Sequence, residues 1–143
     1  MGQGKGEYST IQPFGYFEEV TFGHNGKAFL TYSHQTKAAD DGRPLHGETG
    51  YVRVPAPGRI EWVIAHTSGI AEIQEGTLSV DGTTITMELD ATTVARPPSA
   101  KEVTKIGRSF RLDGDELRYT LRMAAVGQPL QQHLTATLRR AHR

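Results

Sequence analysis

The chain has 143 residues, enough for one compact domain and hardly enough for two. Lysine plus arginine number 16 and aspartate plus glutamate number 16, so the zero net charge gives no reason to expect a nucleic acid or an anionic membrane as partner. The absence of cysteine excludes disulfides, thiolate catalysis and cysteine-ligated zinc or haem. We expect a single domain over residues 1–143. We also expect a cytoplasmic location, because the polar, glycine-rich start does not resemble a signal peptide.

The chain is predicted to form short strands between turns, at a spacing of roughly 8–12 residues. Residues 17–22 and 27–32 flank the turn 23–26, in which Asn25-Gly26 is a strong hairpin signal. The same pattern predicts three more hairpins and then a last strand within residues 123–138. The three hairpins pair residues 50–54 with 59–64, 76–80 with 83–89, and 108–112 with 116–123.

Alternating side chains in these segments favour half-buried antiparallel strands. Ile85, Met87 and Leu89 share one face of their segment, and Tyr119, Leu121 and Met123 share one face of theirs. No amphipathic helix is evident. Roughly ten hairpin-linked strands are best accommodated in a closed up-and-down barrel, because closure removes exposed strand edges. A two-sheet sandwich is the structural alternative to this all-β barrel.

Glycine occupies every second position at the start of the chain, at Gly2, Gly4 and Gly6. The segment lacks the preceding strand and following helix that would give a glycine-rich loop phosphate-binding meaning. Alternate glycines fit a strand that packs closely against something flat or bulky.

None of the six histidines forms a closely spaced metal-binding pair, although a zinc site assembled from distant strands stays open. His24 in a tight turn and His142 in the tail are expected to be surface residues. Nothing fixes a pair among the scattered carboxylates Glu48, Glu72 and Glu75, so a glycosidase has little support.

His133 lies in the last predicted strand, where alternation sets His133, Thr135 and Thr137 against Leu134, Ala136 and Leu138. This pattern alone would turn the leucines inward and leave His133 outside. Either a bulge permitted by residues 127–129 or a wet barrel interior would instead place His133 on the functional face. A lone strand histidine cannot build a zinc site by itself, but it can supply one axial ligand to a haem.

His46 precedes a predicted strand, within the segment Arg43-Pro44-Leu45-His46-Gly47-Glu48. A loop histidine at the mouth of a barrel could reach a ligand. Equally, it could be a solvated loop residue that is hydrogen-bonded to Glu48.

Four segments together resemble the nitrobindins and the related C-terminal domain of a human THAP-type zinc-finger protein. One contains Tyr8-Ser9-Thr10-Ile11 and one contains Pro44-Leu45-His46-Gly47-Glu48; in full they cover residues 6–14, 22–32, 42–51 and 123–138. Ser9 stands where the family usually has proline. The tryptophan of the family's opening Gly-x-Trp-x-Gly-x-Gly motif would fall just before Met1, so we expect a first strand that is cut short.

The resemblance implies a barrel similar to fatty-acid-binding proteins and lipocalins, with a ferric haem b near one mouth. By position, His133 matches the proximal iron ligand, Thr10 a haem contact on the first strand, and Leu45 and His46 the distal pair. Lys101 is the expected cation near a propionate. The implied activity is isomerisation of peroxynitrite to nitrate, together with nitric oxide binding.

Two further functions stay open beside this enzyme. One is a non-catalytic carrier or sensor of haem or nitric oxide, and the other is a haem-free barrel for a small lipophile. The partners expected are small molecules and neither nucleic acid nor membrane, and contacts between small barrels would allow a homodimer.

Overall fold

The computed structural model describes residues 1–8, 11–24 and 26–141, with the side chains of residues 7 and 11–13 left out. Within these residues every regular element is a strand, and no helix is long and apolar enough to cross a membrane. The strands are β1 (Gly2–Tyr8), β2 (Ile11–Gly23), β3 (Phe29–Ala38), β4 (Pro44–Ala56), β5 (Arg59–His66), β6 (Ala71–Asp81), β7 (Thr84–Ala95), β8 (Val103–Asp113), β9 (Glu116–Ala125) and β10 (Gln131–Arg139).

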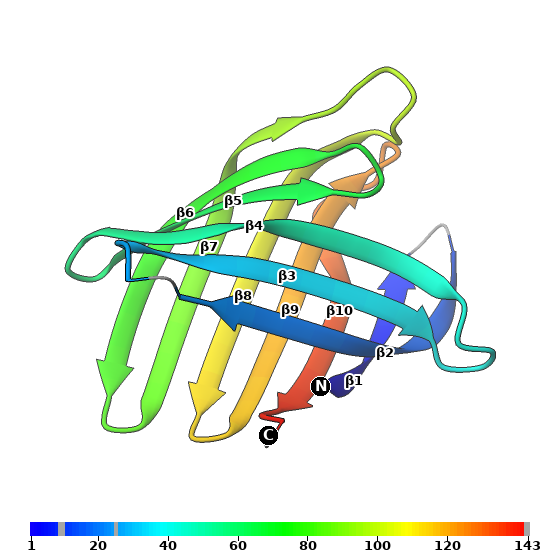
Figure 1. Cartoon of the computed structure of the whole chain (residues 1–143). Coiled ribbons are helices and arrows are strands. Elements are labelled where there is room, and N and C mark those ends of the chain that lie inside the picture. The colour runs from blue at the N-terminus through cyan, green and yellow to red at the C-terminus, as the bar shows by residue number, and fades with distance from the viewer. Residues whose placement is uncertain (9–10, 25, 142–143) are drawn as a thin grey trace.

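The ten strands form one closed antiparallel barrel in which each strand pairs with its neighbours in the sequence (Figure 1). Closure comes from β1, which pairs with β2 on one side and with β10 on the other. The pairing with β10 runs from Gly2 opposite Leu138 to Gly6 opposite Leu134. The predicted barrel is therefore confirmed, and the sandwich alternative is wrong. The strands are also longer than the turn signals indicated, since β7 continues to Ala95.

The alternate glycines of β1 let aromatic rings of β2 lie across that strand. A Cβ atom on Gly6 would overlap the ring of Phe14, and one on Gly4 would overlap the ring of Tyr16. The expected close packing against bulky groups is thus confirmed. The rings fill space that a side chain on β1 would otherwise occupy.

The Gly4→Ala substitution is expected to lower the free energy of unfolding by about 1–3 kcal/mol, as overpacked interiors do. The new methyl group would meet the Tyr16 ring and would approach the backbone oxygen of Thr135 to 2.7 Å. Gly15→Ala is the matched control, because its Cβ would come no closer than 3.5 Å to Ala39. Urea unfolding of both variants checks this prediction, which equal stabilities would contradict.

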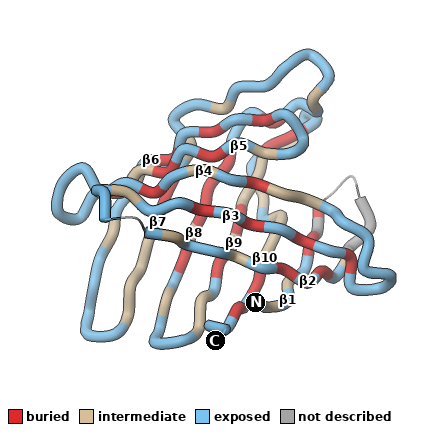
Figure 2. The backbone as a smooth tube through the Cα atoms, in the orientation of Figure 1, coloured by how far each residue is buried: buried red, intermediate tan, exposed pale blue. Residues whose placement is uncertain are grey.

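Buried residues alternate with exposed ones along the strands (Figure 2), and the buried side chains form two clusters inside the barrel. One part is filled by a packed cluster whose largest members are Trp62, Tyr16, Tyr32, Phe110 and Tyr119. A second, smaller cluster includes Tyr8, Ile106 and Leu121 and borders an open cavity. The packed part stabilises the barrel, and the other part is left free to hold a ligand.

Candidate functional site

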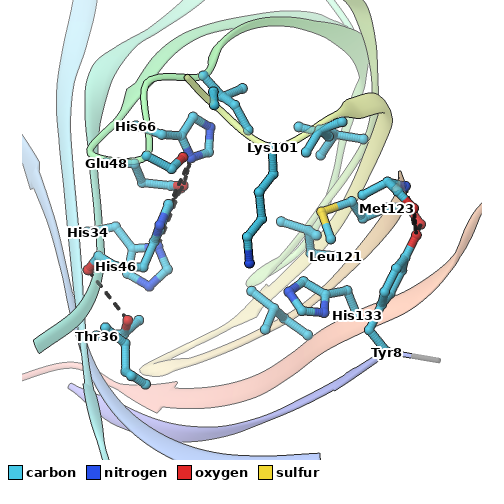
Figure 3. Close-up of a pocket in the computed structure, with 18 of the residues that line it drawn as sticks. Tyr8, His34, Thr36, His46, Glu48, His66, Lys101, Leu121, Met123 and His133 are labelled. Carbon is cyan, nitrogen blue, oxygen red and sulfur yellow. Dashed lines mark hydrogen bonds and ion pairs between the residues drawn. The ribbon is translucent and has the colours of Figure 1, made fainter. Parts of the chain in front are cut away.

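The barrel encloses a cavity of about 930 Å³, within the range of small-molecule and cofactor sites (Figure 3). It lies where β1, β3, β5 and β9 end and where β2, β4, β8 and β10 begin. The connections at 67–70, 96–102 and 126–130 contribute Ser68, Lys101 and Val126 to its lining. Adjacent strand ends therefore bring residues far apart in the sequence onto one surface.

His133 lies on the wall of this cavity because β10 contains a bulge. The pairing with β9 shifts between Gln132, which faces Arg122, and Leu134, which faces Leu121. The extra residue lets His133 and Leu134 both line the cavity, while Ala136 and Leu138 stay buried further along the strand. A bulge, considered from the sequence without a fixed place, is therefore present, and it lies at His133.

Tyr8 and apolar side chains surround His133. The Tyr8 ring meets the imidazole edge-on, with ring centroids 5.5 Å apart. The Tyr8 hydroxyl lies 3.2 Å from the carbonyl oxygens of Met123 and Ala125 and accepts a hydrogen bond from the Ala125 N–H. Leu121, Met123 and Leu134 complete this wall. The tyrosine thus fixes the end of β9 beside the histidine.

Of the other residues expected to hold the cofactor, Leu45 and Lys101 lie among the residues that the structure describes, and Thr10 does not. Leu45 and Lys101 both line the cavity, and the Lys101 side chain extends into it between His46 and His133 (Figure 3). Thr10 lies outside the described residues, so its expected contact stays a prediction. Leu45, Lys101 and His133 therefore share one cavity despite their separation in sequence.

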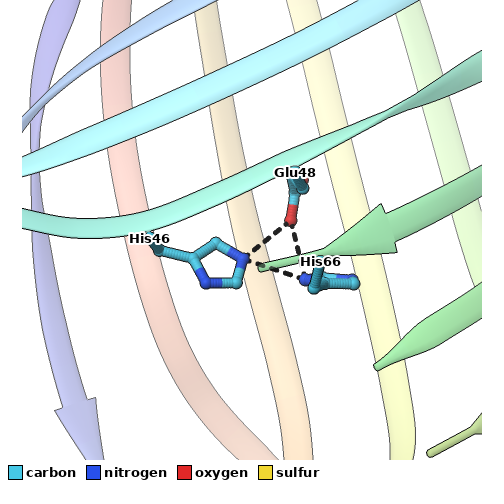
Figure 4. Close-up of side chains that lie close together, drawn as sticks. All are labelled: His46, Glu48 and His66. Carbon is cyan, nitrogen blue, oxygen red and sulfur yellow. Dashed lines mark hydrogen bonds and ion pairs between the residues drawn. The ribbon is translucent and has the colours of Figure 1, made fainter. Parts of the chain in front are cut away.

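His46 lies inside β4, so the expectation that it is a loop residue before a strand is wrong. Its Nε2 atom lies 3.2 Å from Glu48 Oε2, which confirms the hydrogen bond considered from the sequence. His66, at the end of β5, joins the pair, with its Nδ1 atom 2.9 Å from His46 Nε2 (Figure 4). Together they form a polar wall on the side of the cavity opposite His133 (Figure 3).

Arg108 on β8 joins two buried carboxylates beneath this wall. Its guanidinium donates to Glu48 Oε1 at 2.8 Å and to Glu72 Oε1 at 2.5 Å. Burial alone would raise the pKa of both carboxyl groups. The charge of Arg108, with hydrogen bonds from histidines, holds the pKa of Glu48 well below its usual range and also lowers that of Glu72. Both groups are therefore carboxylates at neutral pH.

His34 forms a second buried ion pair, with Glu18. Its Nε2 atom lies 2.5 Å from Glu18 Oε2, and its Nδ1 atom lies 3.1 Å from the Tyr32 hydroxyl, which itself donates to Glu48. Burial lowers the pKa of His34, but hydrogen bonds to Glu18 and Glu48 outweigh that effect and raise it to about 9. His34 is therefore an imidazolium at neutral pH, donating from both ring nitrogens.

Sequence reasoning missed most of this network. It treated Glu48 and Glu72 as scattered, and it did not single out His34, His66 or Arg108. A signal was present, because His34 alternates with Tyr32 and Thr36 on one face of β3, a face that is buried. Alternation can place a polar residue on the inner face, but it cannot name a partner 60 residues away, the separation of Glu48 and Arg108.

Three comparisons place the chain among known proteins. Residues 1–140 match the model of a family described as "THAP4-like, heme-binding beta-barrel domain". The crystal structure of Rv2717c from M. tuberculosis matches with a TM-score of 0.96 and 57% sequence identity, over 99% of this chain and 89% of that one.

Curated relatives match over nearly the same length. "Peroxynitrite isomerase 1" of Mycolicibacterium paratuberculosis is 60% identical over 139 residues, 97% of this chain and 86% of that protein. "Peroxynitrite isomerase" of Mycobacterium leprae is 59% identical over 140 residues, 98% of this chain and 87% of that protein. The chain therefore belongs to the family of THAP4-like, haem-binding β-barrel domains.

Proposed function

We propose that this chain holds a ferric haem b in the cavity, with His133 as iron ligand, and isomerises peroxynitrite to nitrate. The observation that carries the proposal is the bulge that brings His133 onto the wall of a 930 Å³ cavity. The family match and the names of the relatives support it. When bound, haem supplies the iron centre at which this isomerisation takes place.

The residues of the cavity fit such a group. A neutral imidazole is a common haem ligand, and the apolar wall formed by Leu121, Met123 and Leu134 suits a flat, largely apolar macrocycle. Lys101 offers an ammonium group for a propionate, because a flexible lysine can follow an exposed carboxylate. Tyr8 restrains the position of His133 by packing against its ring.

His46 has a different role, on the side of the cavity opposite His133. Its ring is held by Glu48 and His66 and does not depend on a ligand for its orientation. A polar group fixed in this way can hydrogen-bond to a small anion that enters from solvent. His46→Ala is therefore expected to retain haem and to change the rate of the reaction.

Stopped-flow decay of peroxynitrite tests the function. The haem-loaded protein is compared with the haem-free protein and with the same concentration of free ferric haem, and nitrate and nitrite are measured as products. We expect faster decay than with free haem and a higher nitrate yield. Decay no faster than with free haem would overturn the enzyme and favour the non-catalytic carrier of haem or nitric oxide.

A further inference from the structure

Three electron-pair donors converge on one point of the cavity wall opposite His133 (Figure 4). His46 Nε2 lies 2.9 Å from His66 Nδ1 and 3.2 Å from Glu48 Oε2, and the latter two atoms are 3.2 Å apart. The register explains the cluster, since Glu48 pairs directly with His66 across β4 and β5 and His46 lies two residues earlier on β4. Side chains two positions apart on a strand lie on the same face of the sheet.

We propose that His46, Glu48 and His66 bind a divalent transition-metal ion such as Zn²⁺, at a site separate from the haem ligand His133. Two imidazoles and one carboxylate are a ligand set that zinc uses in proteins. This is a site assembled from neighbouring strands, which the spacing of the histidines in the sequence did not show.

The separations of the three atoms match those around a bound metal. Zinc lies about 2.0–2.2 Å from nitrogen and oxygen ligands, so tetrahedral ligands are about 3.3 Å from one another. The observed separations of 2.9–3.2 Å need to widen by only a few tenths of an ångström. The 2.9 Å contact between His46 Nε2 and His66 Nδ1 is a hydrogen bond, in which one nitrogen donates a proton to the lone pair of the other, and a bound cation would take the place of that proton.

Groups behind the three ligands hold them in the orientation that a metal needs. His66 Nε2 lies 2.5 Å from Glu72 Oε1, so an N–H donated to that carboxylate leaves the Nδ1 lone pair facing the cluster. Metal-binding histidines almost always have such a carboxylate or carbonyl partner. Glu48 Oε1 accepts hydrogen bonds from Tyr32 and Arg108, and Oε2, which also accepts one from Arg108 at 3.3 Å, lies 3.2 Å from an imidazole nitrogen of each histidine.

Charge and access are also suitable. Arg108 is a single cation between Glu48 and Glu72, so these three groups, of which Glu48 is itself a ligand, carry one net negative charge at the site. His46, Glu48 and His66 all line the cavity, and the His46 side chain is 34% exposed. A fourth coordination position would therefore face the cavity, as in zinc sites that keep a water or substrate.

Calorimetric titration with Zn²⁺ tests the site, using the protein as purified and after haem removal, both first treated with a chelator. We expect one saturable Zn²⁺ per chain. His66→Gln should weaken binding more than about 100-fold, because it removes a ligand and even an outer partner contributes 10–100-fold. His24→Gln, in an exposed turn, is the matched control and should bind Zn²⁺ like the parent.

Two further variants keep the test decisive if His66→Gln fails to fold. His46→Gln changes a partly exposed residue and should weaken binding to a similar extent. Glu72→Gln, which keeps all three ligands but changes the partner of His66 and of Arg108, should weaken it about 10–100-fold. Co²⁺ added to the haem-free protein should give the intense visible bands of a tetrahedral site. No saturable binding, or parental binding by His46→Gln or His66→Gln, would overturn the proposal.

Discussion

The His133→Ala variant is expected to lose haem while the barrel stays folded. The imidazole lies on the cavity wall, is only partly buried and contacts the smaller cluster through the ring of Tyr8, so we expect its removal to leave the larger packed cluster intact. Removal of the iron ligand should lower haem affinity more than about 100-fold, since partners one step further from a metal already contribute 10–100-fold. Titration followed by the Soret band gives the affinity, and circular dichroism reports the fold.

His24→Ala is the matched control for this experiment, because His24 is exposed in the turn before β3. It should bind one haem per chain, as the parent does. If His133→Ala had the haem content of the parent, measured as the pyridine haemochrome, the assignment of His133 as iron ligand would be wrong. Loss of the barrel's circular dichroism would instead show that His133 stabilises the fold.

The fold could be predicted because its signals are local. Asp81-Gly82 marks a hairpin turn, and Gly82 does adopt a positive φ of 61° between β6 and β7. Leu89 and Leu121 lie on the buried faces that alternation assigned to them. Turns and alternation each depend on a few neighbouring residues, so a chain built of consecutive hairpins carries most of its topology in the sequence.

The position of His133 is harder to predict for a physical reason. Strict alternation assigns His133 and Leu134 to opposite faces, and only an inserted residue brings both inside. The sequence indicated that a bulge could form near the start of the strand, without fixing its place. The resemblance to nitrobindins, and not the alternation, pointed to His133. Its role as ligand, like a homodimer and a cytoplasmic location, stays a prediction.

The polar wall could not be predicted, because its stability comes from partners on different strands. His66 contacts Glu48 and His46 on β4 and Glu72 on β6. A polar side chain on an inner face is favourable only when such partners are present. Sequence reasoning that places polar residues outside will therefore miss a network in which every member depends on the others.

Arg108 has the largest expected effect on stability. Arg108→Met should lower the free energy of unfolding by about 3–5 kcal/mol, because it leaves Glu48 and Glu72 buried without their cation. Arg111→Met, at an exposed position of the same strand, is the matched control and should change stability by no more than about 0.5 kcal/mol. Urea unfolding measures both.

A second substitution separates lost charge pairing from lost packing. In the Arg108→Met background, Glu72→Gln removes one of the two unpaired carboxylates and should restore part of the stability. In the parent background the same Glu72→Gln should be destabilising, because there it breaks the contacts with Arg108 and His66. This reversal of sign is specific to a buried charge network, since independent sites would give additive effects. Equal effects of Glu72→Gln in both backgrounds would show that Arg108 stabilises the barrel through packing alone.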